Sequence, residues 1–444
     1  MATAVHKLQG AGGVGGAYGA GPHWIALLGG SGSDVGLGVA IDSSDNIIVT
    51  GNTASDGAGG ADSITAKYDS SGTLLWDKTL GGSGTEEGYG VAIDSSDNII
   101  ICGVTTSDGA GGNDLLVAKY NSSGTLLWDK TLGGSGTDIG LGVVTDSSDN
   151  IIVTGYTWSD GAGNADALVA KYNSSGTLLW DKTLGGSGTD VGYRVAIDSS
   201  DNIIVIGYTG SDGAGGDDLL VAKYNSSGTL LWDKTLGGSL NEYGRDVAID
   251  SSDNIIVTGQ TSSDGAGGID LLVAKYDSSG NLLWDKTLGG TGSDRGYGVA
   301  VDSSGNIIVT GQTNSDGAGD YDVLVAKYDS SGTLLWDKTL GGTGSEIGRG
   351  VVIDSSDNII VIGYTNSDGA GSNDLLVAKL HPDGLGDGTY GSLVYQDAVL
   401  TDAAAVLTDA AAVITDAAAV LTSADAVLTD AAAVLTEELL PITI

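Results

Sequence analysis

Residues 90–132 read GVAIDSSDNIIICGVTTSDGAGGNDLLVAKYNSSGTLLWDKTL, and near-copies of this stretch recur along most of the chain. The period is marked by tryptophans spaced 52 residues apart, namely Trp24, Trp76, Trp128, Trp180, Trp232, Trp284 and Trp336. Seven units of 52 residues cover 24–387 without a gap (7 × 52 = 364). A fixed period of this length is typical of repeat architectures, so it constrains the fold before any local pattern is considered.

Each copy of the repeat contains four short apolar runs separated by turn sequences. In the second copy these runs are Gly90–Asp94, Asn98–Gly103, Asp114–Tyr120 and Thr125–Leu132. Their β-branched residues favour strands, and the Asp, Ser, Asn and Gly clusters between them favour tight turns. Four strands linked by hairpins form the blade of a β-propeller, and runs that are apolar on both faces suit a sheet packed between two others. We therefore predict an all-β fold, a seven-bladed β-propeller over 23–387.

The two ends of the repeat array predict how the ring closes. The first copy begins with a run of the fourth type at His23–Leu28, and the last copy stops after its third run, Asp374–Leu380. The N-terminal strand is therefore expected to complete the last blade, which hides sheet edges that would otherwise pair with other chains. An open solenoid would need distinct capping repeats at its ends, and the sequence shows none.

The units GVAIDSSDNIIVTG and DLLVAKY resemble the SBBP family of β-propeller repeats. The resemblance covers about 24–387 and recurs seven times, so its specificity concerns the fold. It implies a propeller of the kind found in extracellular or surface-exposed proteins. It implies no fixed catalytic residues, and none is carried over to this chain.

Composition restricts the partners. The 444 residues include 57 acidic and 18 basic side chains, a net charge of −39, which disfavours nucleic acid and anionic lipid. No apolar run approaches the ~20 residues needed to span a bilayer, so we expect no membrane insertion. Cys102 is the single cysteine and is interpreted as core filling.

The first residues are interpreted as a flexible arm. Residues 1–22 are rich in glycine, and Met1–Ala20 lacks the apolar core of a secretory signal. The chain is therefore expected to remain where it is made, to leave by an unusual route, or to be packaged into a particle. We expect it in a virion or on an extracellular surface.

After Gly391 the motif Ala-Val-Leu-Thr-Asp-Ala-Ala recurs every seven residues. On a helix, Val, Leu and two alanines would share one face, with Thr and Asp opposite. The sequence therefore predicts a linker and a heptad-repeat helix within 388–444, with self-association as a coiled coil through 393–440. Pro441 would end this helix. The alternative is a helix that lies on its own propeller.

The sequence offers few candidate catalytic residues. The histidines His6, His23 and His381 lie at or beyond the ends of the repeat array. A carboxylate pair for glycoside hydrolysis would have to arise from near-identical blades, whose aspartates mostly suit turns. We therefore expect no enzymatic activity and no cofactor.

A repeated Asp-Gly-Ala-Gly motif offers weak calcium candidates in Asp56 with Asp62 and Asp108 with Asp114. Calcium prefers six to eight oxygen ligands, which carboxylates and loop carbonyls could supply. The competing interpretation, which we favour, is that the first aspartate starts a turn and the second braces the next strand.

The copies differ mainly at one end of the propeller. The Asp-Ser-Ser-Asp-Asn and Asp/Asn-Ser-Ser-Gly turns barely vary and are expected on one face, whereas Tyr, Trp, Arg, Gln and Asn vary on the other. Such side chains suit contact surfaces, although loops also tolerate drift. The candidate binding residues are Tyr89, Tyr156, Trp158, Tyr193, Tyr208, Tyr243, Arg245, Arg295, Tyr297 and Arg349.

Together these features predict a non-enzymatic structural or attachment protein, with a propeller head on a helical oligomerising stalk. A fibre or decoration component of a virion or surface filament fits best. Its partners would be other structural proteins, with a glycan or surface receptor on the variable face. The alternative is a secreted or surface lectin-like binding protein, and a third interpretation is a propeller hydrolase or lyase.

Overall fold

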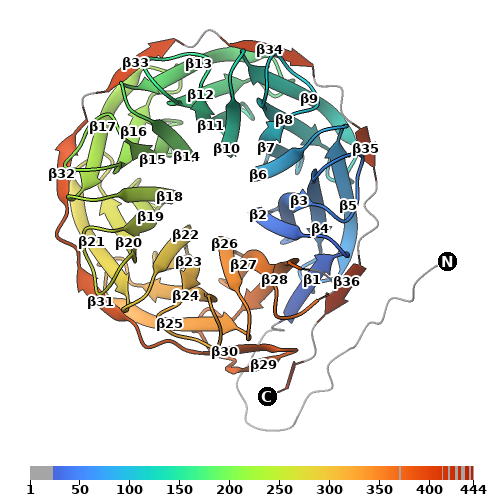
Figure 1. The fold of residues 1–444 in the computed structure, drawn as a ribbon, viewed down its shortest axis with the longest axis vertical. Helices are drawn as coiled ribbons and strands as arrows, with labels where there is room; N and C mark the ends of the chain where they lie inside the picture. Colours follow the sequence, from blue (N-terminus) through green and yellow to red (C-terminus); the bar gives the residue numbers. More distant parts are fainter. Residues whose placement is uncertain are drawn as a thin grey trace.

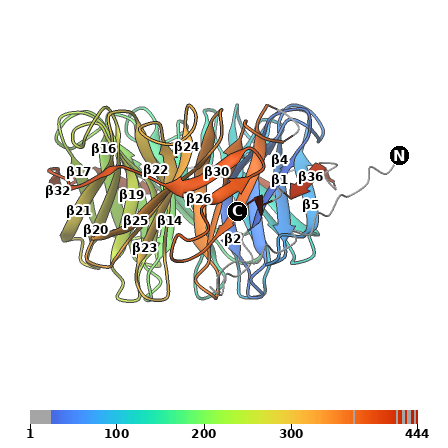
Figure 2. The same ribbon diagram turned by 90° about the horizontal axis from the view of Figure 1, so that it is seen from below.

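Seven β-sheets stand around a central channel and form a disc (Figures 1 and 2). The computed structural model describes residues 24–369, 372–412, 414–418, 421–425, 429–431, 436–439 and 442–443. All elements assigned in these ranges are strands. The described residues therefore contain no helix that could cross a membrane. The predicted all-β, seven-bladed propeller is confirmed. The expected flexible arm, residues 1–22, lies outside the described residues.

Each blade contains four antiparallel strands from the 52-residue repeat, running from the channel to the rim. Blade 1 contains β2 (Asp34–Ile41), β3 (Ile47–Thr53), β4 (Asp62–Tyr68) and β5 (Leu74–Gly81), and blade 2 contains β6 (Glu86–Ile93), β7 (Ile99–Thr105), β8 (Asp114–Tyr120) and β9 (Leu126–Gly133). Blade 3 contains β10 (Asp138–Thr145), β11 (Ile151–Thr157), β12 (Asp166–Tyr172) and β13 (Leu178–Gly185), and blade 4 contains β14 (Asp190–Ile197), β15 (Ile203–Thr209), β16 (Asp218–Tyr224) and β17 (Leu230–Gly237). Blade 5 contains β18 (Glu242–Ile249), β19 (Ile255–Thr261), β20 (Asp270–Tyr276) and β21 (Leu282–Gly289), and blade 6 contains β22 (Asp294–Val301), β23 (Ile307–Thr313), β24 (Asp322–Tyr328) and β25 (Leu334–Gly341). Blade 7 contains β26 (Glu346–Ile353), β27 (Ile359–Thr365), β28 (Asp374–Leu380) and β1 (Trp24–Gly29).

The chain's first described strand closes the ring. In blade 7, β1 pairs with β28 in antiparallel register, with Trp24 opposite Lys379 and Leu28 opposite Leu375. The last blade is therefore built from both ends of the repeat array, as the sequence predicted. Opening the ring requires breaking this pairing, which places the seam inside a sheet.

The hydrophobic core lies between the blades. One cluster joins Ile204 and Leu219 of blade 4 to Val257 and Leu272 of blade 5, and all four side chains are buried. Corresponding clusters fill the other contacts between neighbouring blades. Because both faces of the middle strands are covered, apolar residues such as Ile47, Ile48 and Val49 follow one another instead of alternating with polar ones. Cys102 belongs to one cluster and is fully buried, in agreement with its interpretation as core filling.

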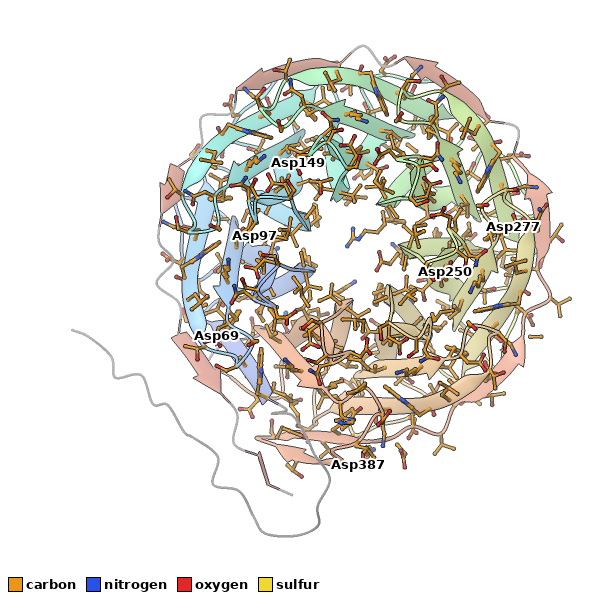
Figure 3. The ribbon with its side chains drawn as sticks, turned by 180° about the vertical axis from the view of Figure 1, so that it is seen from behind. Asp69, Asp97, Asp149, Asp250, Asp277 and Asp387 are labelled. Atoms are coloured by element: carbon orange, nitrogen blue, oxygen red, sulfur yellow. The ribbon has the colours of Figure 1, made fainter. Side chains whose placement is uncertain are left out.

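The invariant turns share one face and bind the blades together. Lys67, at the end of β4, forms a 2.7 Å ion pair with Asp42 of the first turn in its own blade. The Lys67 amine also donates to the Ser122 carbonyl, 3.3 Å away in the second turn of blade 2. The Trp76 indole Nε1 donates to the same carbonyl at 3.4 Å, so the tryptophan that marks the repeat is a contact between blades. In Figure 3 the first-turn residues Asp97, Asp149 and Asp250 lie nearer the channel, whereas Asp69 and Asp277 of the second turns lie near the rim.

A second ring of contacts joins the first turns directly. The Ser43 backbone and hydroxyl donate to Asp97 of the next blade at 3.0 and 2.7 Å. The same contact crosses the seam, where Ser355 donates to Asp45. Each acceptor aspartate has a positive φ of 57–62°, a conformation in which an Asp side chain is tolerated.

The C-terminal segment surrounds the propeller as a belt of short strands. The belt strands are β30 (Leu393–Asp397), β31 (Thr401–Ala404), β32 (Thr408–Ala411), β33 (Thr415–Ala418), β34 (Thr422–Asp425), β35 (Thr429–Ala431) and β36 (Thr436–Leu439). They pair in order with the outer strands of blades 6, 5, 4, 3, 2, 1 and 7. In Figure 2 the belt runs along the side of the disc. Finally β37 (Ile442–Thr443) pairs with β29 (Gly388–Tyr390), beside β30, so the belt returns to its start.

The predicted helix from 393 to 440 is therefore wrong for the described residues of this segment. The heptad period has a different cause, because seven extended residues span about 23 Å at ~3.3 Å each and advance the chain by one blade. Alternation supports this: Ala405 and Leu407 pack against the core between blades 4 and 5, whereas Val406 between them is 85% exposed. The alternative of a tail lying on its own propeller described the location but not the secondary structure. The coiled-coil self-association expected through 393–440 was argued from this helix and stays a prediction.

Charge also matches the belt to the propeller. The tail's acidic residues meet a ring of lysines on the outer strands, where Lys286 lies 3.6 Å from Asp402 and Lys338 lies 2.5 Å from Asp397. Loop aspartates accept hydrogen bonds from the belt backbone, with Val399 donating to Asp316 at 2.6 Å. These contacts repeat once per heptad where both partners are described, since Val406 donates to Asp264 at 2.6 Å.

Candidate functional site

One of the variable positions of the repeat lies on a β-bulge. In every blade the pairing between the innermost strand and its neighbour shifts by one residue, as between Gly36 and Gly38 in blade 1. The same shift occurs in the other six blades. The bulge residues form what we call the bulge ring: Leu37, Tyr89, Leu141, Tyr193, Arg245, Tyr297 and Arg349. A bulge redirects a side chain away from the regular pleat, and bulges are frequent beside functional sites.

The bulge ring contains two tyrosine–arginine pairs. The Arg245 guanidinium lies 4.3 Å from the centre of the Tyr193 ring in the preceding blade. The Arg349 guanidinium lies 4.4 Å from the centre of the Tyr297 ring, again one blade back. Such cation–π contacts orient an arginine without neutralising its charge. The same arrangement therefore occurs twice in blades 4 to 7.

More tyrosines surround the first pair. Tyr243 lies 5.2 Å from the Arg245 guanidinium, and Tyr208 meets Tyr243 edge to face at 4.8 Å. The Tyr193 and Tyr208 rings are 5.8 Å apart. The Tyr243 hydroxyl donates to Asp217 at 2.7 Å, and burial together with this hydrogen bond raises the pKa of Tyr243 to about 12. Tyr243 is therefore neutral at physiological pH where it lies beside the Arg245 guanidinium.

The second pair has a sparser surrounding. Tyr364 lies 5.9 Å from the Arg349 guanidinium, and the Tyr297 hydroxyl donates to Gln312 at 3.3 Å. Tyr364 was not among the sequence-derived candidates, although it occupies the same repeat position as Tyr156 and Tyr208. This contact depends on the pairing of β26 with β27 inside blade 7, where Arg349 lies on the bulge between Gly348 and Gly350.

Deeper in the channel, two blades carry charges where the others carry glycine. The residue after the bulge is Gly38, Gly90, Gly142, Gly298 or Gly350 in five blades, but Arg194 and Asp246 in blades 4 and 5. Both charged residues line a cavity in the channel together with Leu37, Tyr89 and Arg349. The Arg194 Nε atom lies 4.0 Å from Asp246, whose other oxygen accepts from the Val299 backbone at 2.8 Å.

This charged pair was missed as a site, although two breaks in a glycine series were a visible signal. Burial raises the pKa of Asp246 to about 6, and the nearby Arg194 offsets part of that effect. Arg194 also donates to the backbone carbonyls of Leu141 and Tyr193, so its donors are directed at the protein itself. We therefore regard Arg194 and Asp246 as an internal channel contact.

The remaining candidates are placed less closely together. Trp158 is 53% exposed, and its backbone donates to Thr137 in the loop before β10, which places it at the same end of the propeller as the start of the innermost strands. Tyr89 donates to Glu87, and burial followed by this contact raises the pKa of Tyr89 far above its ordinary value. Tyr156 is half-buried, with its pKa raised by burial and then by Tyr193. Arg295 belongs to the same innermost strand as Tyr297.

The acidic motif that suggested calcium acts as turn chemistry. Asp56 accepts from the Gly57 backbone at 2.9 Å, and Asp62 accepts from Ala58 at 3.0 Å across the same loop. In the next blade Asp108 accepts from Gly109 at 2.8 Å, and Asp114 accepts from Ala110 at 3.2 Å. Across the described ranges no group of three or more His, Cys, Asp or Glu side chains is arranged to hold a metal ion.

Comparison with known families agrees with the repeat. The model described as "Beta-propeller repeat", SBBP, matches residues 23–57 and 286–317. A second model, "Domain of unknown function (DUF5122) beta-propeller", matches 95–126, 147–178, 199–230 and 355–390.

Relatives with names are distant. An uncharacterized WD repeat-containing protein of Acanthamoeba polyphaga mimivirus is 25% identical over 77% of this chain and 36% of its own length. The regulatory protein FlaEY of Caulobacter vibrioides is 27% identical over 34% of this chain and 20% of its own length. The chain thus spans about a third and a fifth of these two relatives.

Solved structures similar to this chain include the WD40 domain of Neurospora crassa Pan2, with a TM-score of 0.46, 11% identity and coverage of 78% of this chain and 89% of that domain. Virginiamycin B lyase from Staphylococcus aureus has a TM-score of 0.44 and 9% identity, with coverage of 81% and 100%. The repeat, the family matches and the fold together identify the chain as a seven-bladed β-propeller, with repeats that match the SBBP and DUF5122 β-propeller models.

Proposed function

We propose that this protein is a non-enzymatic attachment protein that binds a partner at the channel mouth formed by the bulge ring. The observation that carries the proposal is the concentration of Tyr and Arg on the bulges of blades 4 to 7, at the end of the propeller where the otherwise similar copies differ. Aromatic residues and arginine dominate the energetics of contact surfaces. A rigid ring that varies only at one mouth is suited to recognition.

The setting we propose is the surface of a particle or filament. The repeat family occurs in surface-exposed proteins, and one relative is viral, although this chain covers only 36% of it. The belt supports such a role because it covers the outer edges of all seven blades, which would otherwise be open to pairing with other chains. A lectin-like binding protein is a second candidate, favoured by the tyrosines around Arg245 and by the exposed Trp158.

The test compares the wild-type chain with a variant in which Trp158, Tyr208, Arg245 and Arg349 are replaced by Ala. Labelled full-length protein is applied to arrays of glycans and surface proteins. The matched control replaces four exposed rim leucines by Ala, namely Leu75, Leu127, Leu179 and Leu231, each about half exposed.

We expect the mouth variant to lose at least about tenfold in affinity, because removal of two or more central contacts of ~1 kcal/mol each has that effect. The leucine control should bind as the wild type does. Equal binding by the mouth variant and the wild type would remove the channel mouth from the proposal.

A further inference from the structure

The three arginines at the channel mouth differ from the fourth in what neutralises them. Arg194 has its ion pair with Asp246 and donates to two backbone carbonyls. Arg245, Arg295 and Arg349 have no ion pair with any residue that the structure describes, although the chain carries 57 acidic side chains. Arginines normally find carboxylate partners in so acidic a protein, so the lack of one at three neighbouring blades requires a reason.

Arg245 and Arg349 are also incompletely hydrogen-bonded. The Nε atom of each is buried and donates to no described residue. A buried donor without an acceptor costs roughly 1–3 kcal/mol, and more when the group is charged. The cation–π contact with Tyr193 or Tyr297 places each guanidinium carbon 4.3–4.4 Å from a ring centre, but a ring supplies no oxygen acceptor for this donor.

A carboxylate is the group that fits this arrangement. The guanidinium presents its N–H donors as a planar fork that matches two carboxylate oxygens, while the contact with the tyrosine ring restricts where the guanidinium can lie. The arrangement occurs twice, on blades 5 and 7, with Arg295 on the blade between them. The mouth therefore provides two guanidinium groups in contact with tyrosine rings and a third cation.

The whole-molecule charge limits how acidic the ligand can be. A net charge of −39 repels a long polyanion before it reaches the mouth. A ligand with isolated carboxylates on an otherwise neutral, amphipathic frame suffers less repulsion. Tyr208 and Tyr243 around Arg245, and the exposed Trp158 at the same end, offer aromatic surface for the apolar face of a sugar ring.

We propose that the channel mouth binds uronic-acid sugars, with Arg245 and Arg349 receiving the sugar carboxylates. This ligand class rests on the proposed attachment function and specifies what is attached to. Tyr193 and Tyr297 are positioning residues, since their rings restrict where the guanidinium groups can lie. Arg194 stays part of the protein's internal contacts.

The test uses two probes that share a sugar ring, methyl β-D-glucuronide and methyl β-D-glucoside, titrated calorimetrically into the full-length protein. They differ only in a carboxylate or a hydroxymethyl group at C6. We expect the glucuronide to bind at least about tenfold more tightly, the factor expected from a charge-assisted hydrogen-bonded pair. Arg245→Lys and Arg349→Lys keep the positive charge but lose the two parallel N–H donors of the guanidinium. Each substitution should weaken glucuronide binding at its own arginine by about tenfold.

The matched control is Leu231→Ala, which changes a half-exposed leucine on an outer strand, away from the bulge ring, and should leave both affinities unchanged. Equal binding of the two sugars, binding of neither, or wild-type affinity in both lysine variants would overturn the carboxylate proposal. These results leave the attachment function to be judged separately. If the wild-type protein still binds to the array and the variant with four alanines does not, the attachment function stands and only the ligand class is discarded.

Discussion

At the scale of single residues, the copies act as internal controls for one another. Six of the seven contacts between adjacent first turns use a serine donor and an aspartate acceptor, as in Ser199 with Asp253. At the junction of blades 5 and 6 the corresponding residues are Ser251 and Gly305. Gly305 has a φ of 80°, and a side chain there would meet nothing within 4 Å. The contact between Ser251 and residue 305 is therefore missing, because glycine has no carboxylate to accept the hydrogen bond.

We predict that Gly305→Asp stabilises the protein by about 1 kcal/mol, because it adds an acceptor for Ser251 and because Asp is tolerated at a similar φ in the other copies. The measurement is the free energy of unfolding in denaturant. Gly305→Ala is the control, since it introduces a Cβ at positive φ without an acceptor and should destabilise. A destabilised Gly305→Asp variant would show that this junction differs from the others.

At the scale of elements, the belt is the feature that most changes the picture of the molecule. Its strands are three to five residues long, too short to be stable alone, and they are held by pairing with the outer strands and by the Lys286–Asp402 and Lys338–Asp397 contacts. Alanines give the segment a helix propensity, but a helix would leave the seven outer edges unpaired. Pairing with those edges therefore outweighs propensity.

We predict that deleting residues 398–444 causes self-association, because it exposes the outer edges of six blades. Light scattering of the full-length and truncated proteins at equal concentration measures this. Removing one heptad at a time should raise the apparent mass stepwise. A helical stalk would produce the opposite result, with an oligomer that becomes a monomer on truncation.

At the scale of the whole molecule, two sets of buried carboxyl groups respond to pH in opposite directions. Burial raises the pKa of Asp77, Asp166, Asp285, Asp322 and Asp337 to about 6. The second set consists of the aspartates that open the first turns, namely Asp42, Asp94, Asp146, Asp198, Asp250, Asp302 and Asp354. Burial alone would raise the pKa of these carboxyl groups. Hydrogen bonds from lysine, asparagine and backbone groups lower it instead, below the ordinary value of 3.8. The first set binds protons more readily in the folded state, and the second set releases them more readily.

We predict maximal thermal stability between about pH 4 and 5. A raised folded pKa makes stability fall as pH rises from 3.8 through about 6, and a lowered folded pKa makes stability fall as pH drops below 3.8. Calorimetric melting midpoints should therefore be higher at pH 4.5 than at pH 8, by about 2 °C or more. A midpoint that rises steadily from pH 4.5 to 8 would contradict this assignment.

The candidate site was only partly predictable. Tyr193, Tyr208, Tyr243 and Arg245 were identifiable as variable positions in near-identical copies, and the structure brings these four together. The Tyr364–Arg349 contact and the Arg194–Asp246 pair were not predicted, because the first depends on how two strands of blade 7 pair and the second on how blades 4 and 5 pack. The bulge itself leaves no clear mark in the sequence, since it is a shift in pairing between two strands.

The sequence by itself determined the number of blades, the four strands in each and the closure by the N-terminal strand, because these follow from the period and from strand and turn preferences that act locally. Only the tertiary structure decided that the C-terminal segment forms strands on the outer edges of the blades, and which bulge residues lie close together. A period of seven suits a coiled coil and also suits one step along a ring of blades. The choice between them lies in the open outer edges, which exist only once the propeller has formed.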